Sequence, residues 1–202
     1  MYRSSITREE TRQLPQCKFE GEVVVIDRNN QDPELIREVA DCKILGFDTE
    51  TRPSFKKGKK NKVALLQLAS ESKAFLVRCN QVGLPEPLVQ ILESPEIIKV
   101  GVAIRDDIKG LQYYSDFKPA GFIDLQKYVS GYGIKSNGLR NITAIVMNFK
   151  VSKSQQLSNW ENEYLSRGQI LYAATDAWVC HQIYTTLVQA GPFRENTSKG
   201  EE

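Results

Sequence analysis

Histidine is nearly absent from this sequence, and a membrane-length apolar run is wholly absent. The single histidine, His181, and four widely spaced cysteines form no Cys-x-x-Cys pair. This excludes a zinc site of the Cys/His type, which needs three or four such ligands at short spacings. No apolar run approaches the roughly 18 residues that cross a bilayer, and the first residues carry no hydrophobic signal segment. The composition predicts an intracellular protein with no membrane segment, cytoplasmic by preference, with a nuclear location left open.

An excess of charge of one sign is also missing. Lys and Arg total 27 against 25 Asp and Glu, which leaves a net charge of +2 over 202 residues. A preference for a polyanion must therefore come from a local cluster of charge rather than from the whole protein. The 41% hydrophobic and 26% charged residues are typical of a globular domain with its own core.

Strand and helix patterns alternate along the chain. Strands are expected at 21–27, 44–48, 63–69, 74–77, 97–102 and 121–125, and helices from 33 and over 88–92, 105–114, 138–147 and 169–189. This order predicts an α/β domain with a mixed sheet. We expect that domain over residues 21–190, an N-terminal extension over 1–20 and a C-terminal tail over 191–202. Residues 1–20 and 197–202 are expected to be loosely held.

Two carboxylates, Asp48 and Glu50, follow the apolar run Ile44–Phe47. Positions i and i+2 of a strand point to one face of the sheet, so both anions should lie on the same side. Adjacent anions at the end of a buried strand repel each other, and a hard divalent cation with oxygen ligands relieves that repulsion. The alternative is that this segment only begins a polar surface loop.

Two other segments place acids at element ends or on one helix face. Tyr172 and Asp176 are four residues apart on the last predicted helix and therefore share a face. A half-buried tyrosine beside a solvent-facing aspartate is the alternative there. Asp106 and Asp107 open the helix that follows strand 97–102, where the helix dipole favours acids in any case. Asp124 is expected to cap a helix rather than add another acid to a site.

Taken together, these segments resemble the DEDD superfamily of 3′→5′ exonucleases, in the subgroup marked by tyrosine. The three superfamily motifs are matched in order by Asp48-Thr49-Glu50, by Val100–Leu111 and by Tyr172–Asp176. The metal-site aspartate of the second motif aligns with Asp107, and Asp106 is its immediate competitor. The similarity covers most of the chain and is greatest to Werner-type exonuclease domains, with ribonuclease D more distant. It implies a ribonuclease H-like fold with helices flanking a mixed sheet.

The resemblance also implies two divalent cations, Mg²⁺ or Mn²⁺, held by four carboxylates. Asp48 would bridge the two ions, and Glu50 and Asp176 would complete the site that binds the attacking water. Asp107 would hold the second ion, and Tyr172 would orient or activate the water. The implied catalytic residues are thus Asp48, Glu50, Asp107, Tyr172 and Asp176.

A basic segment follows the first motif directly. Between Arg52 and Lys62 the sequence holds six cations and no acid. We expect a loop that contacts the phosphate backbone, with Phe55 available to stack on a base; a solvated loop without contacts is the alternative. The expected nucleic-acid contacts are Thr49, Phe55, Lys56, Lys57, Lys59 and Lys60.

The resulting prediction is a metal-dependent 3′→5′ exonuclease that releases nucleoside 5′-monophosphates by a two-metal mechanism. Single-stranded or 3′-recessed DNA is the favoured substrate, and RNA stays open because the sequence offers no identifiable reader of the 2′-hydroxyl. The alternatives are a catalytically silent nucleic-acid-binding module on the same fold, an RNA-directed exonuclease, and a phosphoesterase that acts on small nucleotides.

Overall fold

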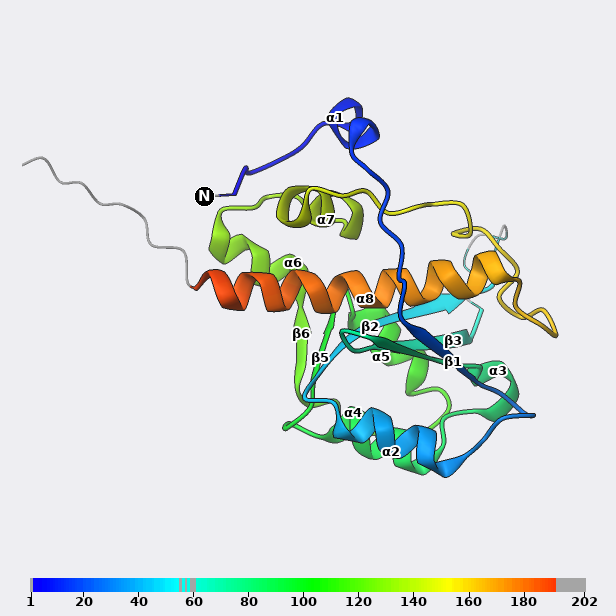
Figure 1. Cartoon of the computed structure of the whole chain (residues 1–202). Helices are drawn as coiled ribbons and strands as arrows, with labels where there is room; N and C mark the ends of the chain where they lie inside the picture. Colours follow the sequence, from blue (N-terminus) through cyan, green and yellow to red (C-terminus); the bar gives the residue numbers. More distant parts are fainter. Residues whose placement is uncertain (1, 55, 57, 59–60, 192–202) are drawn as a thin grey trace, which may run out of the picture.

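A six-stranded mixed sheet runs through the computed structural model, which describes residues 2–54, 56, 58 and 61–191 (Figure 1). The strand order is β1-β4-β3-β2-β5-β6. The pairs β2–β3 and β3–β4 are antiparallel, and the other pairs are parallel. The strands are β1 Glu22–Ile26, β2 Ile44–Thr51, β3 Val63–Ala69, β4 Lys73–Val77, β5 Ile98–Gly101 and β6 Phe122–Asp124. The expected mixed α/β sheet is confirmed.

Helices cover both faces of the sheet (Figure 1). The helices are α1 Arg8–Gln13, α2 Pro33–Asp41, α3 Cys79–Val82, α4 Glu86–Glu93, α5 Arg105–Leu111, α6 Leu125–Tyr128, α7 Leu139–Met147 and α8 Arg167–Ala190, with a 3₁₀ turn, η1, at Val129–Tyr132. Helices α2, α4 and α5 pack on one face around buried residues such as Phe47 and Leu68. Helices α7 and α8 pack together on the other face. No helix in the described ranges is long and apolar enough to cross a membrane.

Helix α8 lies unusually close to the centre of the sheet because small residues face each other there. A Cβ atom at Gly46 of β2 would lie 1.8 Å from the carbonyl oxygen of Ala177. On the helix side, Ala173, Ala174 and Ala177 are all 0% exposed. Backbones can approach this closely only where side chains are absent or minimal. The acidic positions of β2 and α8 are thereby brought together.

Local capping sets the start of two helices. Asp32 accepts from the backbone of Glu34 ahead of Pro33, as predicted for α2. Helix α8 begins before the expected Gln169, because Ser166 and Gln169 form a reciprocal capping box. Such a box satisfies two of the backbone N–H groups that a helix N-terminus leaves without partners. The long helix therefore has a fixed first turn.

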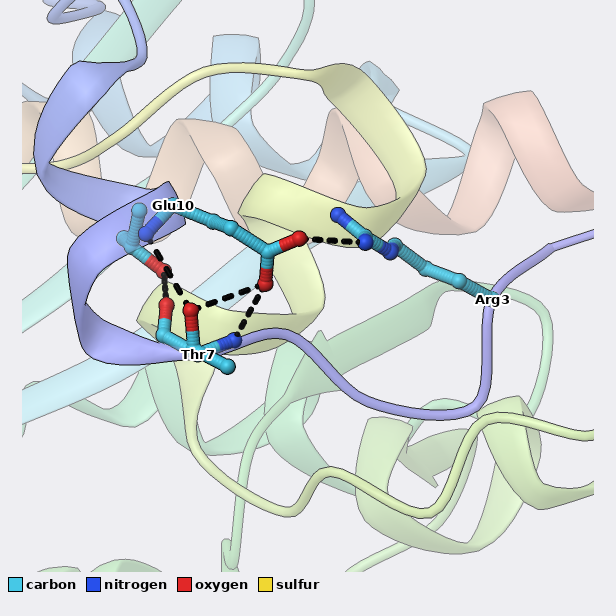
Figure 2. Close-up of polar contacts among 4 residues, drawn as sticks. Arg3, Thr7 and Glu10 are labelled. Carbon is cyan, nitrogen blue, oxygen red and sulfur yellow. Dashed lines mark hydrogen bonds and ion pairs between the residues drawn. The ribbon is translucent and has the colours of Figure 1, made fainter.

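The expectation of a loosely held N-terminal segment is wrong for residues 2–20. Thr7 and Glu10 form a capping box that begins α1, and Arg3 pairs with Glu10 at 2.6 Å (Figure 2). Further along, Phe19 is only 4% exposed, and its N–H donates to the Thr175 hydroxyl of α8 at 3.0 Å. The contact between Phe19 and Thr175 joins parts of the chain that are distant in sequence, so the local pattern did not reveal it. Most of the tail, residues 192–202, lies outside the described residues.

Candidate active site

Asp48 and Glu50 project from β2 toward α8, on one face of the sheet. The strand continues to Thr51 rather than ending at Asp48 as expected, because β3 pairs with it along that length. The register places Asp48 opposite Gln67 and Glu50 opposite Leu65. Both acids are half-buried. The interpretation of this segment as the start of a surface loop is therefore wrong.

Tyr172 and Asp176 come to the same place from α8. They lie one helical turn apart, and the Tyr172 hydroxyl donates a hydrogen bond to the Asp176 carboxylate. Asp176 is only 6% exposed, so the alternative of a solvent-facing aspartate is wrong. Trp160, which is fully buried, lies against Tyr172 with 6.0 Å between the ring centroids. Trp160 thus belongs to the core and supports the position of the tyrosine ring.

Asp107 reaches the cluster from the side of β2 that has no strand partner. Strand β5 ends at Gly101, and no other described residue pairs with β2 beyond Gly46 on that side. The chain then turns into α5 through Ala103, which has a φ of 58° and whose N–H donates to Asp124 at 3.1 Å. Asp124 also caps α6, as predicted.

A hydrogen bond fixes the Asp107 carboxylate against β2. The Thr49 hydroxyl donates to Asp107 with 2.5 Å between Oγ1 and Oδ1. The neighbouring Asp106 is exposed on α5. Of the two adjacent aspartates, Asp107 is the one whose charge acts on Asp48 and Glu50.

The four carboxylates share one electrostatic environment. Burial, followed by the charges of Asp176 and Asp107, raises the pKa of Asp48. Burial and the charges of the other three acids raise the pKa of Glu50 to about 9. Burial raises the pKa of Asp176 to about 7, opposed by the Tyr172 hydrogen bond and the charge of Arg140. Anions crowded into a poorly solvated site disfavour their own ionised forms.

The Tyr172 hydroxyl stays protonated in this setting. Its pKa is raised by burial, then by the charges of Asp176 and Glu50, and by its hydrogen bond to Asp176. A phenol surrounded by carboxylates loses its proton less readily than one in water. In the metal-free site Tyr172 is therefore equipped to donate a hydrogen bond.

The donor set suits a hard divalent cation. Mg²⁺ and Mn²⁺ prefer carboxylate oxygens, and these acids have no adjacent cation that pairs with them within the described residues. In the ranges that the structure describes, no three His, Cys, Asp or Glu side chains are already gathered as a metal-binding group. Carboxylates that raise each other's pKa repel one another. A bound cation would offset that repulsion and allow them to come closer together.

A cavity of about 420 Å³ opens over the acids. Asp48, Glu50, Tyr172 and Asp176 form one wall. The other wall comes from the first turn of α7 and from the irregular segment 148–166. Sequence reasoning did not identify the polar residues of that second wall, which are Arg140, Asn141, Ser152, Lys153 and Gln156.

Most of the expected nucleic-acid contacts cannot be placed. Phe55, Lys57, Lys59 and Lys60 lie outside the described residues. Lys56 is exposed, and the Thr49 hydroxyl is engaged with Asp107. His181 is buried on α8, where burial lowers its pKa, and it does not line the cavity.

The fold and the site together define a hydrolase of the ribonuclease H-like class. A family model described as 3′-5′ exonuclease matches residues 23–191, and the chain belongs to this family. Over 189 residues the chain is 32% identical to the mouse (Mus musculus) bifunctional 3′-5′ exonuclease/ATP-dependent helicase WRN, covering 88% of this chain and 13% of that protein.

Two solved structures share the fold. The Nibbler EXO domain of Aedes aegypti has a TM-score of 0.73 at 22% identity, covering 86% of this chain and 91% of that chain. The Trypanosoma brucei RNase D complex with RNA U12 has a TM-score of 0.74 at 19% identity, covering 84% and 63% of the two chains. The chain spans 13%, 27% and 30% of the length of three curated relatives, the mouse helicase included.

Proposed function

We propose that this chain is a metal-dependent 3′→5′ exonuclease that releases nucleoside 5′-monophosphates from nucleic-acid ends. The observation that carries the proposal is the approach of Asp48, Glu50 and Asp176 from β2 and α8 beside one cavity. Asp107 of α5 lies near enough for its charge to raise the pKa of Asp48 and Glu50. Membership of the 3′-5′ exonuclease family supports the direction of attack.

The four carboxylates would hold two divalent cations, Mg²⁺ or Mn²⁺. When bound, such cations supply charge stabilisation on the phosphate and a nucleophilic hydroxide at neutral pH. The roles of the protein groups follow from their positions. Asp48 is central because it interacts with both Asp107 and Asp176. Glu50 and Asp176 flank the cavity, and Thr49 holds Asp107 in place.

Tyr172 would position the attacking water. Its hydroxyl lies at the cavity and is anchored to Asp176. Because the phenol keeps its proton, its contribution is orientation by hydrogen bonding, in the manner of a preorganised donor. Trp160 packs against its ring and limits its movement.

DNA is the proposed substrate, and the similarity to the mouse WRN protein supports this choice. The RNA in the Trypanosoma brucei complex keeps RNA as the direct competitor. The basic segment after Arg52 would contact the phosphate backbone. Replacing Lys56, Lys57, Lys59 and Lys60 with Ala should weaken binding and flatten its salt dependence; an unchanged salt slope would remove the segment from the interface.

The test uses 5′-labelled single-stranded DNA, 3′-recessed duplex DNA and RNA of matching sequence, each with Mg²⁺ or Mn²⁺. We expect ladders that shorten from the 3′ end, 5′-monophosphate products, no reaction with chelator, and faster loss of DNA than of RNA. Faster loss of RNA would overturn the substrate choice. Intact strands that still bind in a gel shift would indicate the silent binding module, and turnover independent of strand length would indicate a small-nucleotide phosphoesterase.

A further inference from the structure

The part of the cavity lining that comes from α7 and the segment 148–166 carries two cations that the proposed chemistry leaves without a task. Arg140 comes from the first turn of α7, and Lys153 from the irregular segment 148–166. Both line the same cavity as Asp48 and Tyr172. Within the described part of the chain, neither side chain forms an ion pair or a hydrogen bond.

The backbone at Arg140 is held in place, but the side chain lacks a hydrogen-bond partner among the described residues. Its neighbour Leu139 packs into the core beneath α7, which fixes the first turn. The Nε atom of Arg140 is buried and has no hydrogen-bond partner among the described residues. A buried guanidinium nitrogen without an acceptor is costly. An acceptor that arrives with a ligand would remove that cost.

A simpler interpretation is that Arg140 is a counter-ion for the acids. Its charge does lower the pKa of Asp176. A structural counter-ion would be expected to form a direct pair, however, and no nitrogen of Arg140 lies within ion-pair distance of a carboxylate oxygen in the described residues. The guanidinium is near the acids but not bound to them.

The surroundings of Arg140 favour an anion. Gly138 gives α7 no side-chain cap, so the first-turn N–H groups add partial positive charge to the same wall. Lys153 contributes a second full charge. A planar guanidinium fork matches the geometry of a phosphate group.

We propose that Arg140, assisted by Lys153, binds the phosphate group directly 5′ of the one being cleaved. This inference rests on the proposed function. The cleaved phosphate must lie by the carboxylates, where the cations would be held. A strand attacked at its 3′ end continues only in the 5′ direction, so its next phosphate is the anion available to Arg140 and Lys153 in the same cavity.

The test compares two 5′-labelled oligonucleotides that differ at one linkage. One has normal phosphates throughout, and the other has a neutral methylphosphonate at the linkage directly 5′ of the terminal one. Removal of the terminal nucleotide is measured for the wild type, Arg140→Gln, Arg140→Lys and a control, Arg37→Gln. Arg37 is exposed on α2, and Glu34 is its ion-pair partner among the described residues.

The wild type and Arg37→Gln should cleave the methylphosphonate strand roughly tenfold to a hundredfold more slowly than the normal strand, the range for a charged hydrogen bond. Arg140→Gln should be slow on both strands and show a clearly smaller ratio, because only Lys153 is then left to bind that phosphate. Arg140→Lys should fall between the two.

A full methylphosphonate penalty in Arg140→Gln would overturn the inference, and so would a wild type with no penalty. The second result needs no variant, so the test survives if Arg140→Gln fails to fold, which a melting curve would reveal. Failure of the proposed function looks different, because the wild type would then leave even the normal strand intact.

Discussion

The hydroxyl of Thr49 donates to the carboxylate of Asp107, with 2.5 Å between the two oxygens. This single contact joins β2, which carries Asp48 and Glu50, to α5. Thr49 lies between the two acids in the strand, so its side chain points to the opposite face of the sheet. It meets α5 at the edge where β5 has already ended. The fourth carboxylate is therefore positioned by the residue between the first two.

Thr49→Val keeps the shape of the side chain and removes this hydrogen bond. We expect a loss of about 1 kcal/mol in the free energy of unfolding and a higher Mn²⁺ concentration for half-maximal turnover. A metal titration of initial rates measures the second effect. Thr51→Val is the matched control, because Thr51 is exposed at the end of β2 and its side chain has no hydrogen-bond partner among the described residues. Equal metal requirements in the two variants would show that Thr49 does not position Asp107.

Gly46→Ala tests whether the close approach of α8 sets the site. The added Cβ would lie 1.8 Å from the Ala177 carbonyl oxygen, so the helix must move away from β2. We expect destabilisation of about 2–3 kcal/mol or more and a large loss of turnover, because Asp176 would move with the helix. Denaturant unfolding and rate measurements check both effects.

The control for that variant is Gly131→Ala in η1, where an added Cβ meets nothing within 4 Å. Its stability should stay within about 0.5 kcal/mol of the wild type. A Gly46→Ala protein with wild-type stability and turnover would show that α8 can move at this point without cost to the site.

Tyr172→Phe removes the hydroxyl and keeps the ring that packs on Trp160. Turnover should fall by roughly a hundredfold, while substrate affinity in Ca²⁺, which tolerates looser geometry than Mg²⁺, should change little. Single-turnover rates and equilibrium binding separate the two effects. A variant as fast as the wild type would remove the hydroxyl from the mechanism.

The raised carboxyl pKa values predict how stability depends on pH in the metal-free protein. Burial and the charges of the other acids raise the pKa of Glu50 from 4.5 to about 9, and burial raises that of Asp176 from 3.8 to about 7. At pH values between the unfolded and folded pKa of each group, the folded chain holds more protons than the unfolded chain. The free energy of unfolding therefore falls as pH rises through this range. With chelator present, the melting temperature should drop between about pH 5 and about pH 8.

Divalent cations should reverse that drop, most strongly at the high end of the range. Asp176→Asn removes one of the repelling charges, so it should melt higher than the wild type in chelator at about pH 8 and gain less from Mn²⁺. Thermal melts with and without metal measure this. A wild type whose melting temperature rises with pH in chelator would contradict the electrostatic description of the site.

Much of the scaffold could be predicted because it depends on local pattern. The apolar run Val63–Ala69 forms β3 with the predicted bounds, and all seven of its residues are buried. Asp32 and Pro33 begin α2 as expected. The end of β2 was predicted too early, because polar residues there stay in the strand through pairing with β3.

The second wall of the cavity could not be predicted from the sequence. Arg140 reaches the acids only because α7 packs on α8, and Lys153 lies in a segment without regular structure. The position of Asp107 depends on the turn at Ala103 and on Thr49. Each of these depends on contacts between elements, which periodicity does not encode.

The most direct test of the carboxylate site compares the wild type with Asp48→Asn, since Asp48 interacts with acids from both α5 and α8. Single-turnover shortening of a 5′-labelled DNA strand is measured in Mn²⁺, with binding measured in parallel. We predict that Asp48→Asn loses at least about a thousandfold in rate, as expected for loss of a metal-held nucleophile, and still binds the strand. An Asp48→Asn protein that shortens DNA at the wild-type rate would contradict the account.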